Sequence, residues 1–512
     1  MTASPEQVAA NQSAPEPDRS SANMNMRGAA IWALSGQYVS FALQFVTSVI
    51  VSRFFLEPSE VGLFSIALAA AMMISILQDF GLTRYLAGHP SLTAAELRIC
   101  TSLSVLLSLA IAAAVVAVAW PVALFYDEPR LFPILAMIAL SYLFVPLSAV
   151  PTALLSRDMN FKGLFLVNSG GAMVSSVLAV VLAWQGFSAE SLAIAMIGQA
   201  AVRAAIAQRL RPVPIPLIPR LNGASDALRF GAGSTVLCVS GALGVRSPDL
   251  IVGHMLGLAM AGLYSRSSAL AAQLHMLVVG AIGSIFYPAF ARLRDEGEPL
   301  GPHYERVVAG YGAVVWPAMA LLAALAEPVI LTLYGPVWRE AAPLLVWMAL
   351  GELCFVMLPL HMDLPILMGQ MRRVIWYNLF DTAAAAGTLI VFSYWGIEAA
   401  AMARLAYGVL WVCVYAGFMH EVAGFKWRNM LAIYLRSGLV ALITVAPTLI
   451  TIRFWRSAGD LQFLDLAMLG IVAVPCWLGA LFLVRHPARR ELTELLVHLL
   501  PKRMQARFGI AG

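Results

Sequence analysis

Arg246 and Asp249 are the residues whose types and spacing point most directly to chemistry, because both lie in the otherwise apolar stretch "GVRSPDLIVGHMLGLAMAGLYSRSSALAA" (244–272). Residues three apart share one face of a helix, so these two side chains could form a structural ion pair. Alternatively, Arg246 faces a cavity, where its planar guanidinium would bind two oxygens of a diphosphate or an acidic sugar beside Asp249. Pro248 lies between them and removes a backbone hydrogen-bond donor, which predicts a kink and a gating role.

Two further polar residues follow in the next apolar segment. Arg266 and Gln273 are seven residues apart, about two helical turns, so they share a helix face. Arg266 either contacts a ligand or anchors the end of its helix, and both interpretations stay open here. Gln273 extends the same face toward the predicted cavity.

The first apolar segment carries a stripe of amide and hydroxyl side chains. Their spacings of three, four and three residues place them on one helix face: Gln37, Ser40, Gln44 and Thr47. Such a stripe either holds helices together or faces water. Because glutamine is bulky for close helix packing, we favour a hydrated cavity, in which amides and hydroxyls would hydrogen-bond a sugar.

Other charged residues suggest gating. Asp79 and Arg84 bracket the sequence "DFGLTR" at the inner end of the second apolar segment, where they would form an inner gate or cap. Arg404 lies inside a later apolar segment, where pairing with Glu398 is an alternative to facing a ligand.

Asp363 and Asp381 are the candidates for ion coupling. Together with His361 they lie toward the predicted cytoplasmic side and could titrate, which would couple the protein to H⁺ or Na⁺.

A phosphate-binding loop requires a lysine followed by Ser or Thr. The chain has three lysines, and none of them is followed by Ser or Thr: Lys162, Lys426 and Lys502. We therefore expect no ATP hydrolysis by that route. The five cysteines show no paired spacing, so no metal site is implied either, and no cofactor is expected.

These residues must be positioned by membrane-spanning helices. The chain has 512 residues, of which 60% are hydrophobic and only 12% charged. Its mean hydropathy is +0.80. Soluble proteins carry about 25% charged residues, and apolar runs of about 20 residues suffice to cross a membrane. The composition predicts an all-α polytopic membrane protein that does not bind nucleic acid.

Charged residues and turn residues separate about fourteen apolar spans. Their approximate limits are 28–52, 60–79, 99–125, 131–155, 163–184, 187–208, 229–253, 261–290, 306–334, 341–366, 373–395, 397–419, 430–452 and 462–484.

The distribution of basic residues predicts the orientation of these spans. With the N-terminus in the cytoplasm, 25 of the 33 Lys and Arg residues fall in inside segments, five in outside segments and three within spans. Because inside loops are enriched in Lys and Arg, both termini are expected to be cytoplasmic. Outside loops do not exceed about a dozen residues.

The longest connection, "RLRPVPIPLIPRLNGASDALR" (209–229), is rich in proline and basic residues, which is typical of a linker between two halves. We therefore divide the chain into six parts. These are a disordered cytoplasmic tail (1–27), an N-lobe of six spans (28–208), a cytoplasmic linker (209–228), a C-lobe of six spans (229–420), two further spans (421–486) and a cytoplasmic tail that either forms an amphipathic helix or is solvated (487–512).

The two halves contain a weak internal repeat. The stretch "IVSRFFLEPSEVGLFS" (50–65) aligns without gaps on "LIVGHMLGLAMAGLYS" (250–265). At this offset of 200 residues, Gly62 matches Gly262 and Ser65 matches Ser265. Both copies follow a span that runs outward, which predicts a parallel repeat about an axis along the membrane normal.

The chain resembles the polysaccharide transporters of the multidrug/oligosaccharidyl-lipid/polysaccharide superfamily. The stretches that carry the resemblance are "VSRFFLEPSEVGLFSIALA", "LQDFGLTRYL", "VRSPDLIVGHMLGLAMAGLYSRSSALA", "IFYPAFARLRDEGEPL" and "LTLYGPVWREAAPLLVWMAL", from residue 51 to about 350. The resemblance implies two six-helix lobes around a central cavity, related by a pseudo-two-fold along the membrane normal, plus two C-terminal helices.

The resemblance also implies a function. The expected activity is that of a secondary transporter, not an enzyme, that flips a lipid-linked oligosaccharide of the undecaprenyl-diphosphate type by alternating access. It would act in the bacterial inner membrane during exopolysaccharide or lipopolysaccharide biosynthesis, beside a polysaccharide polymerase and export machinery.

Two other functions are weighed against this one. A multidrug exporter of the same fold is the nearer alternative, but its cationic substrates favour an acidic cavity, whereas Arg246 and Arg266 are basic. A membrane glycosyltransferase or O-antigen polymerase would display catalytic groups on substantial outside loops, and the predicted outside loops are short.

Overall fold

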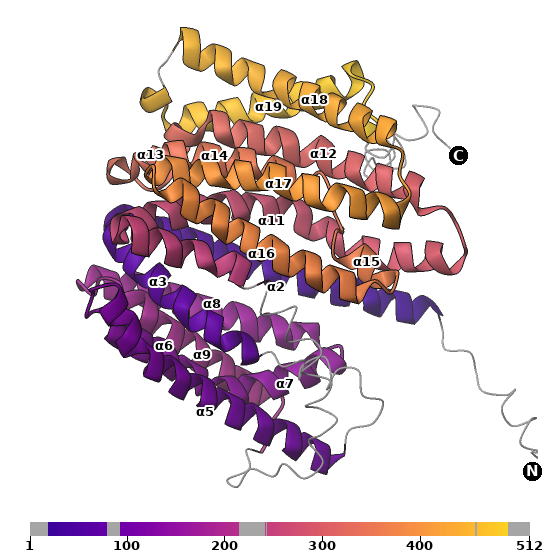
Figure 1. The fold of residues 1–512 in the computed structure, drawn as a ribbon. Coiled ribbons are helices and arrows are strands. Elements are labelled where there is room, and N and C mark those ends of the chain that lie inside the picture. The colour runs from indigo at the N-terminus through magenta and orange to yellow at the C-terminus, as the bar shows by residue number, and fades with distance from the viewer. Residues whose placement is uncertain (1–18, 79–92, 215–240, 242, 456–457, 490–512) are drawn as a thin grey trace, which may run out of the picture. The chain divides into compact units, whose positions relative to one another are not determined.

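The structure is a computed structural model that describes residues 19–78, 93–214, 241, 243–455 and 458–489 (Figure 1). Every regular element in these ranges is helical, so the predicted all-α class is confirmed. The longer helices are α2 (Arg19–Phe54), α3 (Pro58–Ser75), α5 (Ala94–Phe125), α6 (Leu131–Tyr142), α7 (Val145–Arg157), α8 (Phe161–Trp184), α9 (Glu190–Leu210), helix 243–256, α11 (Leu258–Asp295), α12 (Leu300–Ala324), α13 (Ala326–Leu333), α14 (Ala341–Phe355), α16 (Met371–Ser393), α17 (Ile397–Ala423), α18 (Trp427–Phe454) and α19 (Phe463–Leu483). Short helical turns are η1 (Ile76–Gln78), η2 (Pro336–Trp338), α15 (Asp363–Leu367) and η3 (Ala458–Asp460).

The helices have the lengths that a membrane requires. Nine helices of the described ranges are long and apolar enough to cross a bilayer, and ten if α6 and α7 form one span broken by a bend of 42°. The multi-pass prediction is confirmed, whereas the number fourteen is not. The predicted single span 131–155 is two helices, and α14 has only 15 residues. The chain also becomes helical at Arg19, inside the tail 1–27 that was predicted to be disordered.

Glycine separates two pairs of consecutive helices, and proline begins a third helix. Gly257 separates helix 243–256 from α11 with a φ of 92°, and Gly396 separates α16 from α17 with a φ of 99°. Both φ values are positive, in a region of backbone conformation that residues with a Cβ atom rarely adopt, so glycine fits these turns. Pro58 occupies the first turn of α3, where its missing N–H removes no helical hydrogen bond.

The chain forms two compact units. The first unit comprises Met1–Ser48, Leu77–Ala117 and Ala136–Ser234. Within it α8 lies along α9, and α7 packs against both. Buried side chains of α5 and α7, among them Cys100, Leu103, Val150 and Leu154, form a common hydrophobic cluster.

The second unit comprises Val49–Ile76, Val118–Leu135 and Thr235–Gly512. Within it α12 lies along α18, α18 along α19, and α17 packs against both α14 and α16 (Figure 1). The Trp477 indole of α19 donates a 2.7 Å hydrogen bond to the carbonyl oxygen of Ala313 in α12. The boundaries of these units cut through α2, α5 and α6, and the lobes 28–208 and 229–420 remain a prediction.

Residues paired by the predicted repeat meet where α3 packs against α11. A Cβ atom added at Gly62 would lie 1.8 Å from the Leu258 carbonyl oxygen, and one added at Gly262 would lie 1.8 Å from the Pro58 carbonyl oxygen. One turn further along, the Ser65 hydroxyl donates to the Ser265 hydroxyl at 2.9 Å. Residues matched by the offset of 200 therefore touch one another, and the small side chains permit backbone contact between the helices.

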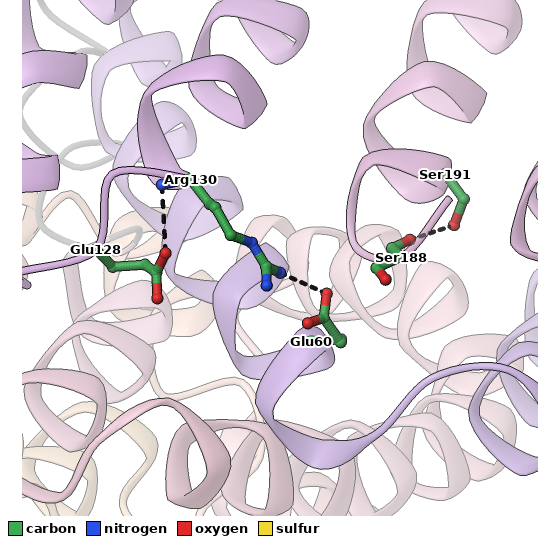
Figure 2. A network of polar contacts seen from close by, with 5 residues as sticks. All are labelled: Glu60, Glu128, Arg130, Ser188 and Ser191. Atoms are coloured by element: carbon green, nitrogen blue, oxygen red, sulfur yellow. Dashed lines mark hydrogen bonds and ion pairs between the residues drawn. The ribbon is translucent and has the colours of Figure 1, made fainter. Parts of the chain in front are cut away.

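Polar side chains fix the starts of α3 and α9 (Figure 2). Arg130 donates to the carboxylate of Glu60, in the first turn of α3, at 2.6 Å, while its own backbone N–H donates to Glu128. The Ser191 hydroxyl donates to the Ser188 carbonyl oxygen at the start of α9. The Arg130–Glu60 pair is exposed to solvent on the arginine side, and such pairs add only about 0–1 kcal/mol to stability.

Candidate functional site

A polar cavity of about 380 Å³ lies within the second unit. Helix 243–256, α11, α16 and α17 form most of its wall, and Phe355 at the end of α14 and His361 before α15 complete it. The lining residues that matter below are Gly244, Pro248, His361, Asp381, Arg404 and Tyr407. Ionisable side chains within membrane-spanning helices are rare and mark functional sites by default, so we build the site around them.

The strongest contacts beside the cavity join Arg404, Glu352 and His275. The Arg404 guanidinium lies 2.7 Å from one carboxylate oxygen of Glu352, and the His275 Nδ1 atom lies 2.9 Å from the other. The guanidinium also lies over the Phe355 ring, with Cζ 4.3 Å from the ring centroid. Glu352 is buried, and each carboxylate oxygen has a nitrogen partner. A buried carboxylate is tolerated only when it is paired in this way.

Two glycines allow α14 and α17 to approach closely enough for this ion pair. A Cβ atom at Gly351 would lie 2.6 Å from the Arg404 Cγ atom, and one at Gly408 would lie 2.8 Å from the Cys354 Cβ atom. The suggested pairing of Arg404 with Glu398 is therefore wrong. Glu398 is exposed in the first turn of α17, and residues six apart point to different faces of a helix.

Asp381 is the second acidic group, and it lines the cavity directly. The Tyr407 hydroxyl of α17 donates to its carboxylate at 2.6 Å, the length typical of a charge-assisted hydrogen bond. Within the described ranges no ion pair to Asp381 is formed, because Arg404 pairs with Glu352. The same ranges contain no cluster of three or more His, Cys, Asp or Glu side chains that could hold a metal ion.

Helix 243–256 contributes the predicted gating residue. Pro248 lines the cavity together with Gly244, so the structure brings Pro248 and Asp381 to one site. Arg246 and Asp249 lie on the same helix and are partly buried, but they do not line this cavity. Within the described ranges their charged groups do not come within ion-pair distance of each other, but the charge of Arg246 acts on the Asp249 carboxylate. Both interpretations of the two residues therefore stay predictions.

The remaining predicted residues lie away from the cavity wall. Arg266 and Gln273 are partly buried on α11 and are not among the lining residues. Asp363 is exposed at the start of α15. Asp79 and Arg84 lie outside the described residues.

The amide and hydroxyl stripe lies on α2, in the part of that helix that belongs to the first unit. Gln37 and Gln44 are exposed, and Ser40 is partly buried. The Thr47 hydroxyl donates to the Leu43 carbonyl oxygen one turn earlier, which satisfies it within the helix. The two glutamines therefore keep their amides available for a ligand, and their role stays a prediction.

Three residues of the site escaped the sequence analysis: His275, Glu352 and Tyr407. Glu352 is an acidic residue in the apolar stretch 341–366, and that alone was a usable signal. Tyr407 and His275 gave no comparable signal, because tyrosine and histidine are common in apolar helices as packing residues.

Comparison with known proteins identifies the family. The family described as "Polysaccharide biosynthesis protein" matches residues 50–343, more than half of the chain. The chain belongs to the polysaccharide biosynthesis protein family. This confirms the predicted resemblance to the polysaccharide transporters of the multidrug/oligosaccharidyl-lipid/polysaccharide superfamily.

Two relatives of this polysaccharide biosynthesis protein show the extent of the similarity. The "succinoglycan biosynthesis transport protein ExoT" of Rhizobium meliloti (strain 1021) is 26% identical over 406 residues, which cover 77% of this chain and 78% of the relative. The "lipopolysaccharide biosynthesis protein WzxC" of Escherichia coli (strain K12) is 22% identical over 318 residues, which cover 62% of this chain and 64% of the relative.

The fold is that of a solved transporter. A structure of the lipid II flippase MurJ in its inward closed conformation matches with a TM-score of 0.71. The match covers 89% of this chain and 99% of that chain at 12% identity, so it establishes the fold alone. This member of the polysaccharide biosynthesis protein family is a multi-pass membrane protein with a transporter fold.

Proposed function

We propose that this protein is a secondary transporter that flips a lipid-linked oligosaccharide across the bacterial inner membrane. The observation that carries the proposal is the polar cavity itself. Charged residues of membrane-spanning helices, Arg404 and Asp381, face 380 Å³ of space in a chain of the polysaccharide biosynthesis protein family. A purely structural bundle has no use for such costly groups at this position.

In an alternating-access mechanism, each of the predicted site residues would have its own role. Arg246 does not line the cavity in this conformation, but in another conformation of the cycle it would hold the diphosphate of the carrier lipid, because guanidinium groups bind phosphate oxygens in pairs. Gln37 and Gln44 would hydrogen-bond the saccharide through their exposed amides. Pro248 would let helix 243–256 bend as the cavity changes its opening from one side to the other. Arg266, Gln273, Ser40 and Asp249 would complete the polar lining in other conformations of the cycle.

Cellular context follows from the same proposal. The excess of Lys and Arg in the segments assigned inside supports cytoplasmic termini. The substrate would be a diphosphate-linked intermediate, and a polysaccharide polymerase and export machinery on the outer side would consume the product. The two relatives are named for succinoglycan biosynthesis and lipopolysaccharide biosynthesis, which supports this context.

A multidrug exporter is the second candidate, and one observation favours it. Asp381 faces the cavity and forms no ion pair within the described ranges, which would suit a cationic substrate. The Glu352 carboxylate does not add to this acidity, because Arg404 neutralises it.

Deletion of the gene in its host distinguishes the two candidates. We expect the lipid-linked saccharide to accumulate on the cytoplasmic side and the wild-type gene to relieve the accumulation. Arg246→Ala, expressed at wild-type levels, should fail to relieve it. Relief by both would leave the flippase standing and make Arg246 structural. Intact surface polysaccharide without accumulation would reject the flippase and favour drug export.

Ion coupling is expected to depend on Asp381 rather than on Asp363. Asp381 faces the cavity, whereas Asp363 is exposed at the start of α15, so only the first can sense both substrate and ion. We expect Asp381→Asn to remove the stimulation of transport by an imposed H⁺ or Na⁺ gradient and Asp363→Asn to retain it. Transport into vesicles with and without each gradient measures this. Equal stimulation of both variants would contradict the assignment.

A further inference from the structure

A second, larger space lies beside the polar cavity, and it is almost entirely apolar. This apolar groove measures about 1070 Å³ and is lined by α3, α5, helix 243–256 and α16. Its apolar lining includes Met73, Val118, Phe125, Ile251, Met255 and Ile390. None of the lining residues in the described ranges is Asp, Glu, Lys or Arg.

Two of the polar side chains that line the groove are hydrogen-bonded within the protein. The Tyr126 hydroxyl donates to the Leu250 carbonyl oxygen at 2.8 Å, and the Ser393 hydroxyl donates to the Leu389 carbonyl oxygen at 2.7 Å. The His254 ring stacks on Phe125 with the ring centroids 4.0 Å apart. The groove thus presents a hydrocarbon-like surface, which does not retain water well.

On two helices the residues that line the groove follow those that line the polar cavity. On helix 243–256 the polar cavity is lined as far as Pro248 and the groove from Leu250 to Leu256. On α16 Leu389 lines the polar cavity, and the next residue, Ile390, lines the groove. At 1.5 Å per residue, the groove part of helix 243–256 extends about 9 Å. A polar compartment and an apolar one therefore follow each other along the same helices.

This order matches the order of chemical groups in a lipid-linked saccharide. We infer that the apolar groove binds the part of the carrier lipid's polyprenyl chain nearest to the diphosphate, while the headgroup occupies the polar cavity. The inference rests on the proposed function. A bulk phospholipid fits less well, because its headgroup stays at the membrane surface and would not reach the polar cavity. Methionine and aromatic side chains suit a methyl-branched chain, since they adapt to irregular apolar shapes.

The chain offers a matched pair of variants to test the inference. Val118 lines the groove, and Val116 lies two residues earlier on α5 without lining it. The two valines are similarly exposed, at 39% and 43%. Val118→Trp should place an indole in the groove and obstruct it locally, whereas Val116→Trp places the same indole on the same helix outside it.

The experiment uses the full-length protein in phosphatidylethanolamine and phosphatidylglycerol nanodiscs. The probe is a polyprenyl phosphate with a photoreactive diazirine on its first isoprene units. We expect it to label peptides containing residues 250–256 or 390–394, and unlabelled polyprenyl phosphate to compete. Labelling should fall about tenfold in Val118→Trp and remain unchanged in Val116→Trp. Equal competition by added phospholipid, labelling elsewhere, or equal loss in both variants would overturn the inference.

Complementation of the deletion strain separates this inference from the proposed function. If wild type and Val116→Trp relieve saccharide accumulation and Val118→Trp does not, both stand. If all three relieve it, the flippase stands and the groove assignment fails. If the wild type itself does not relieve any accumulation, the proposed function fails, whatever the labelling shows.

Discussion

We expect Arg404→Met to lower the free energy of unfolding by about 3–5 kcal/mol, because it leaves the buried Glu352 carboxylate without its cation. His275 alone would then hold that carboxylate. Glu352→Leu should be destabilising for the same reason, since it leaves the guanidinium over Phe355 unpaired. Unfolding of the purified protein in mixed detergent and dodecyl sulfate measures both effects.

The double variant Arg404→Met with Glu352→Leu is the control that separates stability from function. Removing both charges should restore stability to within about 1 kcal/mol of wild type, since a buried ion pair and an apolar pair of similar volume are often equivalent. Its transport should nevertheless fall at least about tenfold, the effect expected from losing charged hydrogen bonds to a ligand. A stable double variant that transports normally would show that the pair is only structural.

The second large effect is expected at the contact between α3 and α11. Gly62→Ala should destabilise the protein by about 1–3 kcal/mol and reduce transport, because the added methyl group meets backbone rather than a movable side chain. The helices would have to separate, and the hydrogen bond from Ser65 to Ser265 would then be lost. Thermal unfolding in detergent and complementation of the deletion strain measure the two consequences.

Gly470→Ala is the matched control for this prediction. Gly470 lies inside α19, and no atom lies within 4 Å of a Cβ atom added there. Alanine should therefore stabilise this helix by about 0.5–1 kcal/mol. If Gly62→Ala proved as harmless as Gly470→Ala, the close approach of α3 to α11 would not exist in the membrane.

The residues that the predicted repeat pairs include those that touch. Gly62 with Gly262 and Ser65 with Ser265 meet where α3 contacts α11, and their small side chains allow the helix backbones to approach. The repeat itself remains a prediction. The all-α class and the multi-pass character followed from apolar length alone. The count of fourteen spans stays unconfirmed, and the bend of 42° between α6 and α7 within the predicted span 131–155 left no gap in the apolar pattern.

The candidate site was predicted in part. Pro248 and Asp381, which were predicted for gating and ion coupling, line the polar cavity, whereas none of the seven residues predicted to line a cavity is among its lining residues. A proline and an isolated acid in apolar segments can be recognised from the sequence, but the face on which a side chain meets a cavity cannot. The partner of Arg404 was not predictable, because the pairing depends on how closely Gly351 lets α14 approach α17. An ion pair between two helices depends on tertiary packing. The sequence analysis suggested Glu398 instead, because Glu398 lies close to Arg404 along the same helix.

The central claim is that the charged polar cavity moves a lipid-linked saccharide. The most direct test reconstitutes wild type and the Arg404→Met, Glu352→Leu double variant in vesicles that contain a fluorescent lipid-linked oligosaccharide. Loss of fluorescence to a membrane-impermeant quencher reports headgroups that have crossed. We predict rapid crossing with the wild type and little above protein-free vesicles with the double variant. Wild-type vesicles that behave like protein-free ones would contradict the claim.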